Sequence, residues 1–247
     1  MASLYDRHDL YDLVSPPNAA MEAFYVGAAQ TNGARVLELA CGSGRFTVPM
    51  AEAGLQVVGI DVAEPMLGRT RQLAAERGLQ IETHLLDMRD FDLEREFDTV
   101  FIAANSIMHL LTPEDFRRFF ASVARHLAPG GQLLFDCFVP SALLLGRPGQ
   151  RVPMTAIAHP ELGDISIDEI IDYDPVTQVA SAEWLWSTAA EKDFHRVSLQ
   201  LRQIYPQELP LLLEANGFRL QERFGDFDRH PFGPEAFRQV CVSGIVR

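Results

Sequence analysis

The stretch Val36 to Ala51, VLELACGSGRFTVPMA, decides how the rest of the chain folds. It begins as a short apolar strand that carries Glu38, turns through Gly42-Ser43-Gly44, and continues into a helical pattern. A strand, a glycine-rich loop and a helix in direct succession are typical of the first unit of a nucleotide-binding α/β sheet. The dinucleotide pattern G-x-G-x-x-G needs a glycine at position 47, where this chain has Thr47, so the loop is not expected to cradle a pyrophosphate.

Pro49 limits where the helix after the loop begins. A proline in a helix interior removes a backbone hydrogen bond and clashes with the preceding turn. Either the helix starts near Thr47, which places Pro49 in its first turn, or a helix from Gly44 is kinked.

Strand and helix patterns alternate from Arg35 to Phe138. The apolar runs VLELA, QVVGI, IETHLL, FDTVFIAA and QLLFDCF predict buried strands, and helical spacing covers 63–77 and 113–127. Thr112 is expected to cap the second of these helices, and Pro129-Gly130-Gly131 is expected to end it. Strands separated by helices predict a parallel sheet with helices on both faces.

The pattern changes after Pro140. Residues 164–173, 179–188 and 194–204 alternate between apolar and polar side chains, which predicts a small inserted antiparallel sheet. Residues 206–216 predict a helix that ends at Gly217, and residues 218–227 and 239–246 predict a terminal hairpin.

Composition narrows the function further. The 247 residues carry a formal net charge of −13, which disfavours general binding to nucleic acid or to an anionic membrane. The N-terminal segment has no signal-peptide core, and no uninterrupted run of about 18 apolar residues occurs, so we expect a cytoplasmic protein without a membrane span. Cys41, Cys137 and Cys241 are widely spaced and predict buried, reduced thiols rather than a disulfide framework or a metal site.

Polar residues follow each predicted strand at its carboxyl end, where ligands bind in open α/β sheets. They are Gly42-Ser43-Gly44, Asp61, Asp87-Met88, Ala103 to Ser106, and Asp136. A carboxylate at the end of the second strand has the lone pairs to accept hydrogen bonds from two ribose hydroxyls, which is the role expected of Asp61.

Five segments, in this order, resemble the class I S-adenosylmethionine (SAM)-dependent methyltransferases of small-molecule type. They are VLELACGSGRF, GIDVAEPML, LLDMRDF, FDTVFIAANSIMHLL and the L-x-PGG turn before QLLFD. The resemblance spans about residues 35–138, with a weaker tail from YPQELPLLLEANGFRL to the last hairpin. The N-terminal segment and the insertion are similar to those of amino-sugar and glycine N-methyltransferases.

The resemblance implies SAM as cofactor, S-adenosylhomocysteine (SAH) as product and no metal. It assigns cofactor contacts to Tyr11, Glu38, Ala40, Gly42, Gly44, Arg45, Asp61, Val62, Met66, Asp87, Met88, Ala103 and Asn105. In this assignment Glu38 orders the loop near the methionine ammonium, Asp61 binds the ribose, and Asp87 meets the adenine edge. For Asp87 the alternative is a cap for the segment that follows it.

Fewer residues are assigned to the methyl acceptor than to the cofactor. His109 and Tyr11 are the candidates for a base or an acceptor-orienting residue, against a helix-end histidine and a tyrosine that only packs the N-terminal segment. Trp184 and Trp186 share one face of a strand and are assigned to the acceptor pocket, against packing of the insertion or a dimer surface. We expect a core position for His195, against a functional role. The acidic side chains Asp164, Asp168, Glu169, Asp172 and Asp174 predict the solvated side of the insertion, against a surface that attracts a cationic acceptor.

The predicted fold is a Rossmann-like α/β class I methyltransferase fold. It has a mostly parallel seven-stranded sheet with an antiparallel last strand, an inserted antiparallel sheet and an N-terminal lid. The predicted divisions are an N-terminal helical lid (1–34), a SAM-binding core (35–140), a β insertion that covers the acceptor or makes a dimer contact (141–204), and completion of the core (205–247).

The predicted function is methyl transfer from SAM to a nitrogen or oxygen of a small molecule, by a protein that has no general affinity for nucleic acid, binds no membrane and is a possible homodimer. A transfer-RNA-modifying enzyme that uses a SAM derivative and a non-catalytic module that binds SAM or SAH remain alternatives. The acidic charge disfavours the first, and the intact loop after the first strand disfavours the second.

Overall fold

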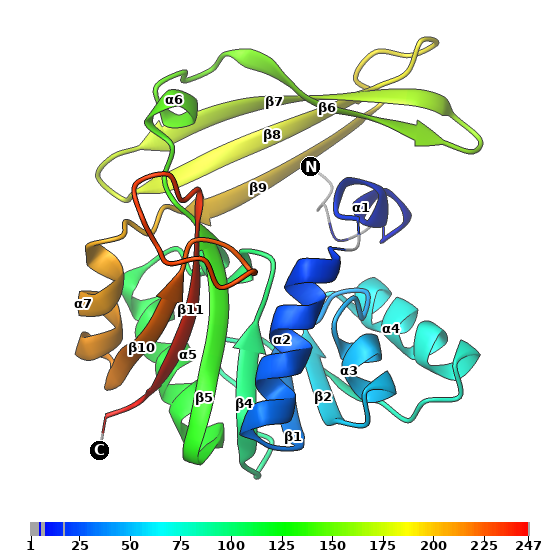
Figure 1. Ribbon diagram of the computed structural model, residues 1–247. Helices are drawn as coiled ribbons and strands as arrows, with labels where there is room; N and C mark the ends of the chain where they lie inside the picture. The colour runs from blue at the N-terminus through cyan, green and yellow to red at the C-terminus, as the bar shows by residue number, and fades with distance from the viewer. Residues whose placement is uncertain (1–4, 6–7, 17, 247) are drawn as a thin grey trace.

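The computed structural model describes residue 5, residues 8–16 and residues 18–246. A large sheet with helices on both faces forms the lower part of the molecule in Figure 1, and a smaller sheet arches over one end of it. The helix α1 (His8–Val14) lies between the two sheets (Figure 1), so the N-terminal segment covers the end of the large sheet.

The large sheet has the strand order β10-β11-β5-β4-β1-β2-β3. Its strands are β1 (Arg35–Leu39), β2 (Gln56–Asp61), β3 (Glu82–Leu85), β4 (Phe97–Ile102), β5 (Leu127–Phe138), β10 (Phe218–Phe224) and β11 (Arg238–Ile245). The first five strands pair in parallel, whereas β11 is antiparallel to both β5 and β10. The predicted mostly parallel seven-stranded sheet with an antiparallel last strand is confirmed.

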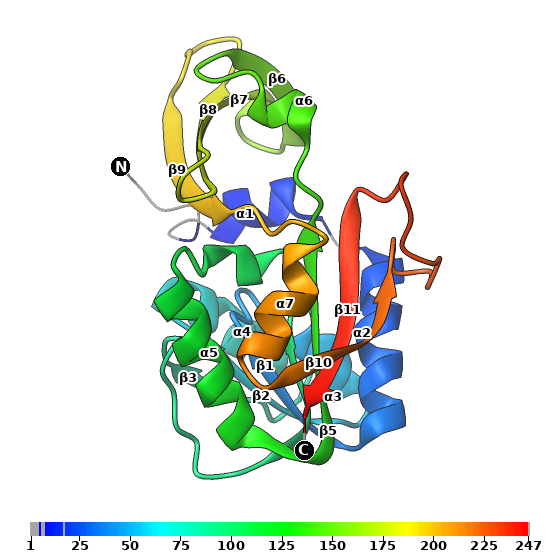
Figure 2. The same ribbon diagram turned by 90° about the vertical axis from the view of Figure 1, so that its left-hand side faces the viewer.

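Helices bury both faces of this sheet, with α5 and α7 on one side and α2 and α3 on the other (Figure 2). The helices are α2 (Ala19–Asn32), α3 (Thr47–Glu52), α4 (Glu64–Glu76), α5 (Pro113–His126) and α7 (Glu208–Ala215), with a 3₁₀ turn η2 (Ser106–His109) after β4. Successive residues of β1 face opposite sides, so Val36 packs with α2 while Leu37 packs with α5.

Local signals in the sequence explain several helix boundaries. The helix α3 begins at Thr47, so Pro49 stands in its first turn, the first of the two alternatives. Thr112 caps α5 by accepting a hydrogen bond from the Asp115 amide at 3.1 Å, while the Asp115 carboxylate accepts one from the Thr112 amide at 2.9 Å. Gly217 follows α7 with a φ of +81°, the left-handed conformation expected at that position.

The small sheet is antiparallel, with the order β6-β7-β8-β9. It contains β7 (Gly163–Asp174), β8 (Val179–Ser187) and β9 (His195–Arg202), which were predicted, and β6 (Arg151–His159), which was not. A short helix α6 (Ala142–Leu145) links it to β5. The strand β6 escaped prediction because it is an edge strand that carries Pro153 and is mostly exposed, so it shows no apolar alternation.

The turn Pro129-Gly130-Gly131 does not separate α5 from the next strand as expected. The strand β5 already begins at Leu127, and the turn is absorbed as an irregularity in its pairing with β4, where the register shifts between Phe97 and Thr99. Gly130 has a φ of +82°, which lets the backbone bend without leaving the sheet.

The two helices of the N-terminal region pack differently. The helix α2 buries Met21, Phe24 and Tyr25 against the large sheet, whereas α1 packs Leu10 against the inserted sheet. The proposed divisions of the chain stay a prediction, and this packing favours counting α2 with the core and α1 alone as the cover. Among the described residues, no helix is long and apolar enough to cross a membrane.

Candidate functional site

The loop after β1 is tied to the carboxyl end of β2 by the side chain of Asp61. One oxygen of this carboxylate accepts a hydrogen bond from the Gly42 amide at 2.8 Å, and the other accepts one from the Ala63 amide at 2.8 Å. The carboxylate is partly buried, and this burial raises its pKa from the ordinary value against the opposing effect of those amides. Asp61 therefore stands at the mouth of the loop with lone pairs left for a ligand.

The backbone of this loop takes conformations that favour glycine. Gly42 and Gly44 have φ values of +55° and +85°. A Cβ at Gly44 would lie 3.0 Å from the side chain of Thr70, whose hydroxyl donates to the Gly42 carbonyl at 2.8 Å. A Cβ at Gly42 would meet nothing within 4 Å, so that side of the loop is open to a ligand.

Glu38 lies beneath the loop in a fully buried position. Its side chain is 2% exposed, and it accepts a hydrogen bond from the hydroxyl of Thr47. Burial raises the pKa of the Glu38 carboxyl to about 8. Thr47 was noted in the sequence because it replaces the third glycine of the dinucleotide pattern. In the structure it supplies the hydrogen-bond partner that the buried Glu38 carboxyl requires.

The backbone after β4 turns sharply at Ala104 and Asn105. Both amides donate to the carboxylate of Asp136, at 2.8 and 3.2 Å. Ala103 is buried just before this turn, and the side-chain oxygen of Asn105 is buried without a hydrogen-bond partner among the described residues. A donor on a ligand would satisfy that oxygen.

The residues assigned to the adenine differ in their surroundings. Met66 is buried on α4, whereas the side chain of Val62 is 65% exposed. Asp87 accepts hydrogen bonds from the backbone and guanidinium of Arg89 at 2.6 to 3.0 Å, and this pairing lowers the pKa of its carboxyl. Met88 packs beside this pair against the core. The adenine role of Asp87 stays a prediction. Residues 87–90 form a turn, and no helix follows between β3 and β4 for Asp87 to cap, so the capping alternative is wrong.

The helix α1 and the residue that follows it, Ser15, form hydrogen bonds with the glycine loop. Ser43 donates to the carboxylate of Asp12 at 2.8 Å, and Arg45 donates to the hydroxyl of Ser15 at 2.6 Å. Burial raises the pKa of the Tyr11 hydroxyl, and the nearby Asp61 carboxylate adds to this shift. Tyr11 packs with Tyr5, their ring centroids 5.7 Å apart, and its contact with SAM or the acceptor stays a prediction.

His109 is bound to a residue that the sequence did not single out. Its Nε2 lies 2.7 Å from the hydroxyl of Tyr5. Burial lowers the pKa of the imidazole below 6.5, and a hydrogen bond with the backbone of Gln200 partly opposes this. A neutral ring that donates to the Gln200 carbonyl presents its Nε2 as an acceptor, so the assigned tautomer has Tyr5 donating to His109. The sequence held one indication of a functional role for Tyr5, namely its position in the same N-terminal segment as Tyr11.

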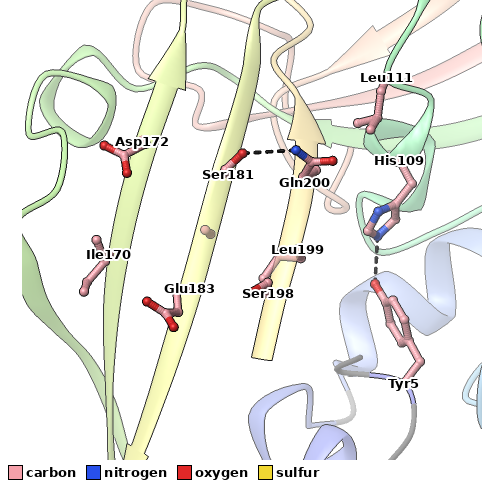
Figure 3. Close-up of a pocket in the computed structure, with 11 residues that line it drawn as sticks. Tyr5, His109, Leu111, Ile170, Asp172, Ser181, Glu183, Ser198, Leu199 and Gln200 are labelled. Atoms are coloured by element: carbon pink, nitrogen blue, oxygen red, sulfur yellow. Dashed lines mark hydrogen bonds between the residues drawn. The ribbon is translucent and has the colours of Figure 1, made fainter. Parts of the chain in front are cut away.

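A cavity of about 640 Å³ opens beside this pair (Figure 3). Tyr5, His109 and Leu111 line its side next to the large sheet, and residues of β7, β8 and β9 line the rest. The carboxylates of Asp172 and Glu183 lie on β7 and β8, across β9 from the Tyr5–His109 pair. The cavity therefore combines an acidic wall with a phenol and an imidazole.

Trp184 and Trp186 do not line this cavity. Both pack, with Ile165, Ile167 and Val197, against the N-terminal segment around Leu10. The indole of Trp184 donates to Glu169 at 2.9 Å, and the ring of Trp186 contacts that of His195. This position matches the packing alternative, and their acceptor role stays a prediction.

No group of three or more histidine, cysteine or acidic side chains among the described residues is arranged to hold a metal ion. The three cysteines are free and buried. The site is thus built from a glycine loop, two carboxylates near strand ends, a buried turn and the Tyr5–His109 pair.

Residues 36–131 match the family described as a methyltransferase domain. The CcbJ methyltransferase of Streptomyces caelestis has a similar structure, with a TM-score of 0.86, 27% identity and coverage of 99% of each chain. Residues 36–131 therefore form a methyltransferase domain, and the chain has the class I methyltransferase fold.

Two curated methyltransferases show the range of this similarity. The cypemycin N-terminal methyltransferase of a Streptomyces species is 33% identical over 144 residues, which cover 56% of this chain and 58% of that protein. The glycine/sarcosine N-methyltransferase of Parasynechococcus marenigrum is 28% identical over 245 residues, which cover 96% of this chain and 82% of that protein. The chain spans only about half the length of several other curated relatives that it matches.

Proposed function

We propose that this protein transfers a methyl group from SAM to the nitrogen of a small amine and releases SAH. The observation that carries the proposal is the Tyr5–His109 hydrogen bond of 2.7 Å, beside a cavity with two carboxylates and close to the loop that Asp61 ties down. The proposal joins a methyl-donor site to a group able to receive a proton from an acceptor.

The residues present fit SAM. Gly42 leaves open space above the loop, Asp61 offers lone pairs to ribose hydroxyls, and Asn105 has a buried oxygen that lacks a donor. SAM supplies an electrophilic methyl group on a sulfonium and contains no phosphate, which agrees with a loop that lacks the third glycine. Tyr11, Arg45 and the other cofactor contacts assigned from the sequence remain part of this proposal.

The chain's own contribution to the reaction is to orient an amine and to manage its proton. An amine attacks only as its neutral form, so a cationic acceptor must lose a proton first. In this proposal Tyr5 orients the acceptor from the cavity wall, and the proton that the amine loses passes to the Tyr5 oxygen while the Tyr5 hydroxyl proton passes to Nε2 of neutral His109. The pair is part-buried, which limits the water that would compete for the same contacts.

The choice of nitrogen over oxygen rests on charge and on the relatives. Asp172 and Glu183 in the cavity wall favour an acceptor that arrives as a cation, because opposite charges attract across a partly desolvated surface. The two curated relatives named above are both N-methyltransferases by name. No comparison favours transfer-RNA modification or a non-catalytic module.

The proposal is tested by incubating the full-length protein and SAM with amino sugars and amino acids, each paired with its hydroxy analogue. We expect SAH release with at least one amine, together with a product heavier by one or two methylene units. Exclusive methylation of the hydroxy analogues would overturn the choice of nitrogen. Absence of SAH release with every acceptor, from a protein that binds SAM, would contradict the proposal that this protein methylates such small molecules.

The pKa of Glu38 predicts how binding depends on pH. The carboxyl ionises near 4.5 when unfolded and at about 8 when folded. Between these values the folded, ligand-free chain holds a proton that the unfolded chain lacks, so its free energy of unfolding falls as pH rises. An ammonium held near Glu38 favours the carboxylate, so SAM affinity should rise from about pH 5 towards pH 8, with proton release.

Glu38→Gln is the control for this pH dependence, because the amide has the same shape and no titrating proton. Calorimetric titration with SAM in buffers of different ionisation enthalpy measures the proton release directly. We expect the release to disappear in the variant. Equal proton release in both proteins would show that another group titrates.

A further inference from the structure

The turn after β4 holds two successive residues in the left-handed region. Ala104 has a φ of +56° and Asn105 a φ of +64°. This conformation is unfavourable for residues with a Cβ, and it persists where the surroundings determine it. The surroundings of this turn therefore have to supply the interactions that keep it in place.

Asp136, at the end of β5, supplies these interactions. Its carboxylate is fully buried and accepts hydrogen bonds from the Ala104 amide at 2.8 Å and the Asn105 amide at 3.2 Å. A third hydrogen bond comes from the hydroxyl of Tyr25 on α2, at 2.7 Å. One carboxylate thus joins the turn to β5 and to a helix from the N-terminal region.

The side chain of Tyr25 has no freedom to turn its hydroxyl elsewhere. It is fully buried, and its ring centroid lies 5.1 Å from that of Phe101 and 5.6 Å from that of Phe46. Burial raises the pKa of this hydroxyl well above the ordinary value, so it stays a donor. Aromatic packing thereby orients the Tyr25 hydroxyl toward the carboxylate of Asp136.

The turn presents the side chain of Asn105 with a buried oxygen that lacks a partner among the described residues. Buried acceptors are almost always satisfied, so this oxygen indicates a missing donor. An ammonium group is a donor with three hydrogens, and SAM and SAH carry one on their amino-acid end.

We propose that Asp136 and Tyr25 are positioning residues that hold Asn105 against the ammonium of the amino-acid end of SAM. This inference rests on the proposed function, since it requires that the protein bind SAM. Neither residue contacts the ligand, and both act through the Ala104–Asn105 backbone. Their loss should weaken recognition of the amino-acid end while leaving recognition of the adenosine end intact.

The test compares two ligands that differ only at that end, SAH and 5′-methylthioadenosine, which lacks the amino acid. In Asp136→Asn an amide N–H would oppose the Asn105 amide, and we expect SAH affinity to fall about tenfold. In Tyr25→Phe one buried donor is lost, and we expect a fall of about threefold. Affinity for methylthioadenosine should stay within about twofold in both variants.

Ser243→Ala is the matched control, because it removes a buried hydroxyl that donates to Leu133 in the same sheet, at 3.2 Å, away from the turn. It should leave both affinities unchanged. Equal weakening of both ligands by Asp136→Asn and Tyr25→Phe, or no weakening of SAH, would overturn the inference. If Asp136→Asn does not fold, Tyr25→Phe decides alone.

The two proposals fail in different ways. A wild-type protein that binds neither SAH nor methylthioadenosine contradicts the proposed function. A wild-type protein that binds SAH, with variants that do not distinguish the two ligands, contradicts only the positioning role of Asp136 and Tyr25.

Discussion

Replacing Asp61 with alanine should weaken SAM binding at least about tenfold, because a charge-assisted hydrogen bond to ribose hydroxyls is lost. The carboxylate also fixes the glycine loop through the Gly42 and Ala63 amides, each at 2.8 Å, so its removal disorders the backbone that faces the ligand. Both effects act in the same direction. Calorimetric titration with SAM measures the sum.

Two further variants separate the ribose contact from a general loss of stability. Asp61→Asn keeps one acceptor and should give an intermediate affinity. Asp90→Asn removes an exposed acid that pairs with Arg118, at 3.0 Å, and should leave SAM affinity unchanged. If Asp61→Ala bound SAM as tightly as the wild type, the assignment of the ribose site would be wrong.

The largest effect on turnover should come from Tyr5→Phe. The substitution removes the hydroxyl and retains the ring, which packs 5.7 Å from Tyr11 and 5.8 Å from His109 between centroids. If Tyr5 orients the acceptor and manages its proton, kcat should fall about 100-fold, the lower end of the usual range for such groups. SAM affinity should change less than about threefold, since the hydroxyl faces the acceptor.

His109→Gln tests how the imidazole contributes. A glutamine amide can still hydrogen-bond to Tyr5 and cannot take up a proton, so retained activity indicates orientation and lost activity indicates proton uptake. In the wild type the low pKa of His109 keeps the ring neutral at neutral pH, and protonation below pH 6.5 should reduce kcat/KM. A pH profile that is identical in the wild type and His109→Gln would rule out a titrating His109.

The order of the large sheet was predictable because its signals are local. Each parallel strand is a short apolar run, each helix shows its own spacing, and Thr112 marks one boundary unambiguously. The errors fall where tertiary context overrides such signals. The edge strand β6 tolerates Pro153, and the sheet absorbs Gly130 as an irregularity instead of a break.

The site was less predictable than the fold. The carboxyl ends of parallel strands lie at one edge of the sheet, so Asp61 and Asn105 could be predicted as ligand contacts from their positions after these strands. Other contacts of the site join segments that are far apart in the chain. No periodicity in the sequence predicts how such segments pack together. Tyr5 meets His109 across 104 positions, and Tyr25 meets Asp136 across 111 positions.

Trp184 and Trp186 show what the alternation of side chains along a strand can and cannot predict. Sequence alternation correctly placed Trp184 and Trp186 on one face, and it carried no information on what that face covers. The structure puts α1 there, so a face assigned to the acceptor is filled by the chain itself.

Calorimetric titration of the full-length protein with SAM tests the central claim most directly. We expect saturable binding of one SAM per chain, competition by SAH, and a dissociation constant below about 1 mM, in the range usual for enzyme substrates. Absence of binding up to that concentration would contradict the assignment of the loop, Asp61 and Asn105 to a methyl-donor site.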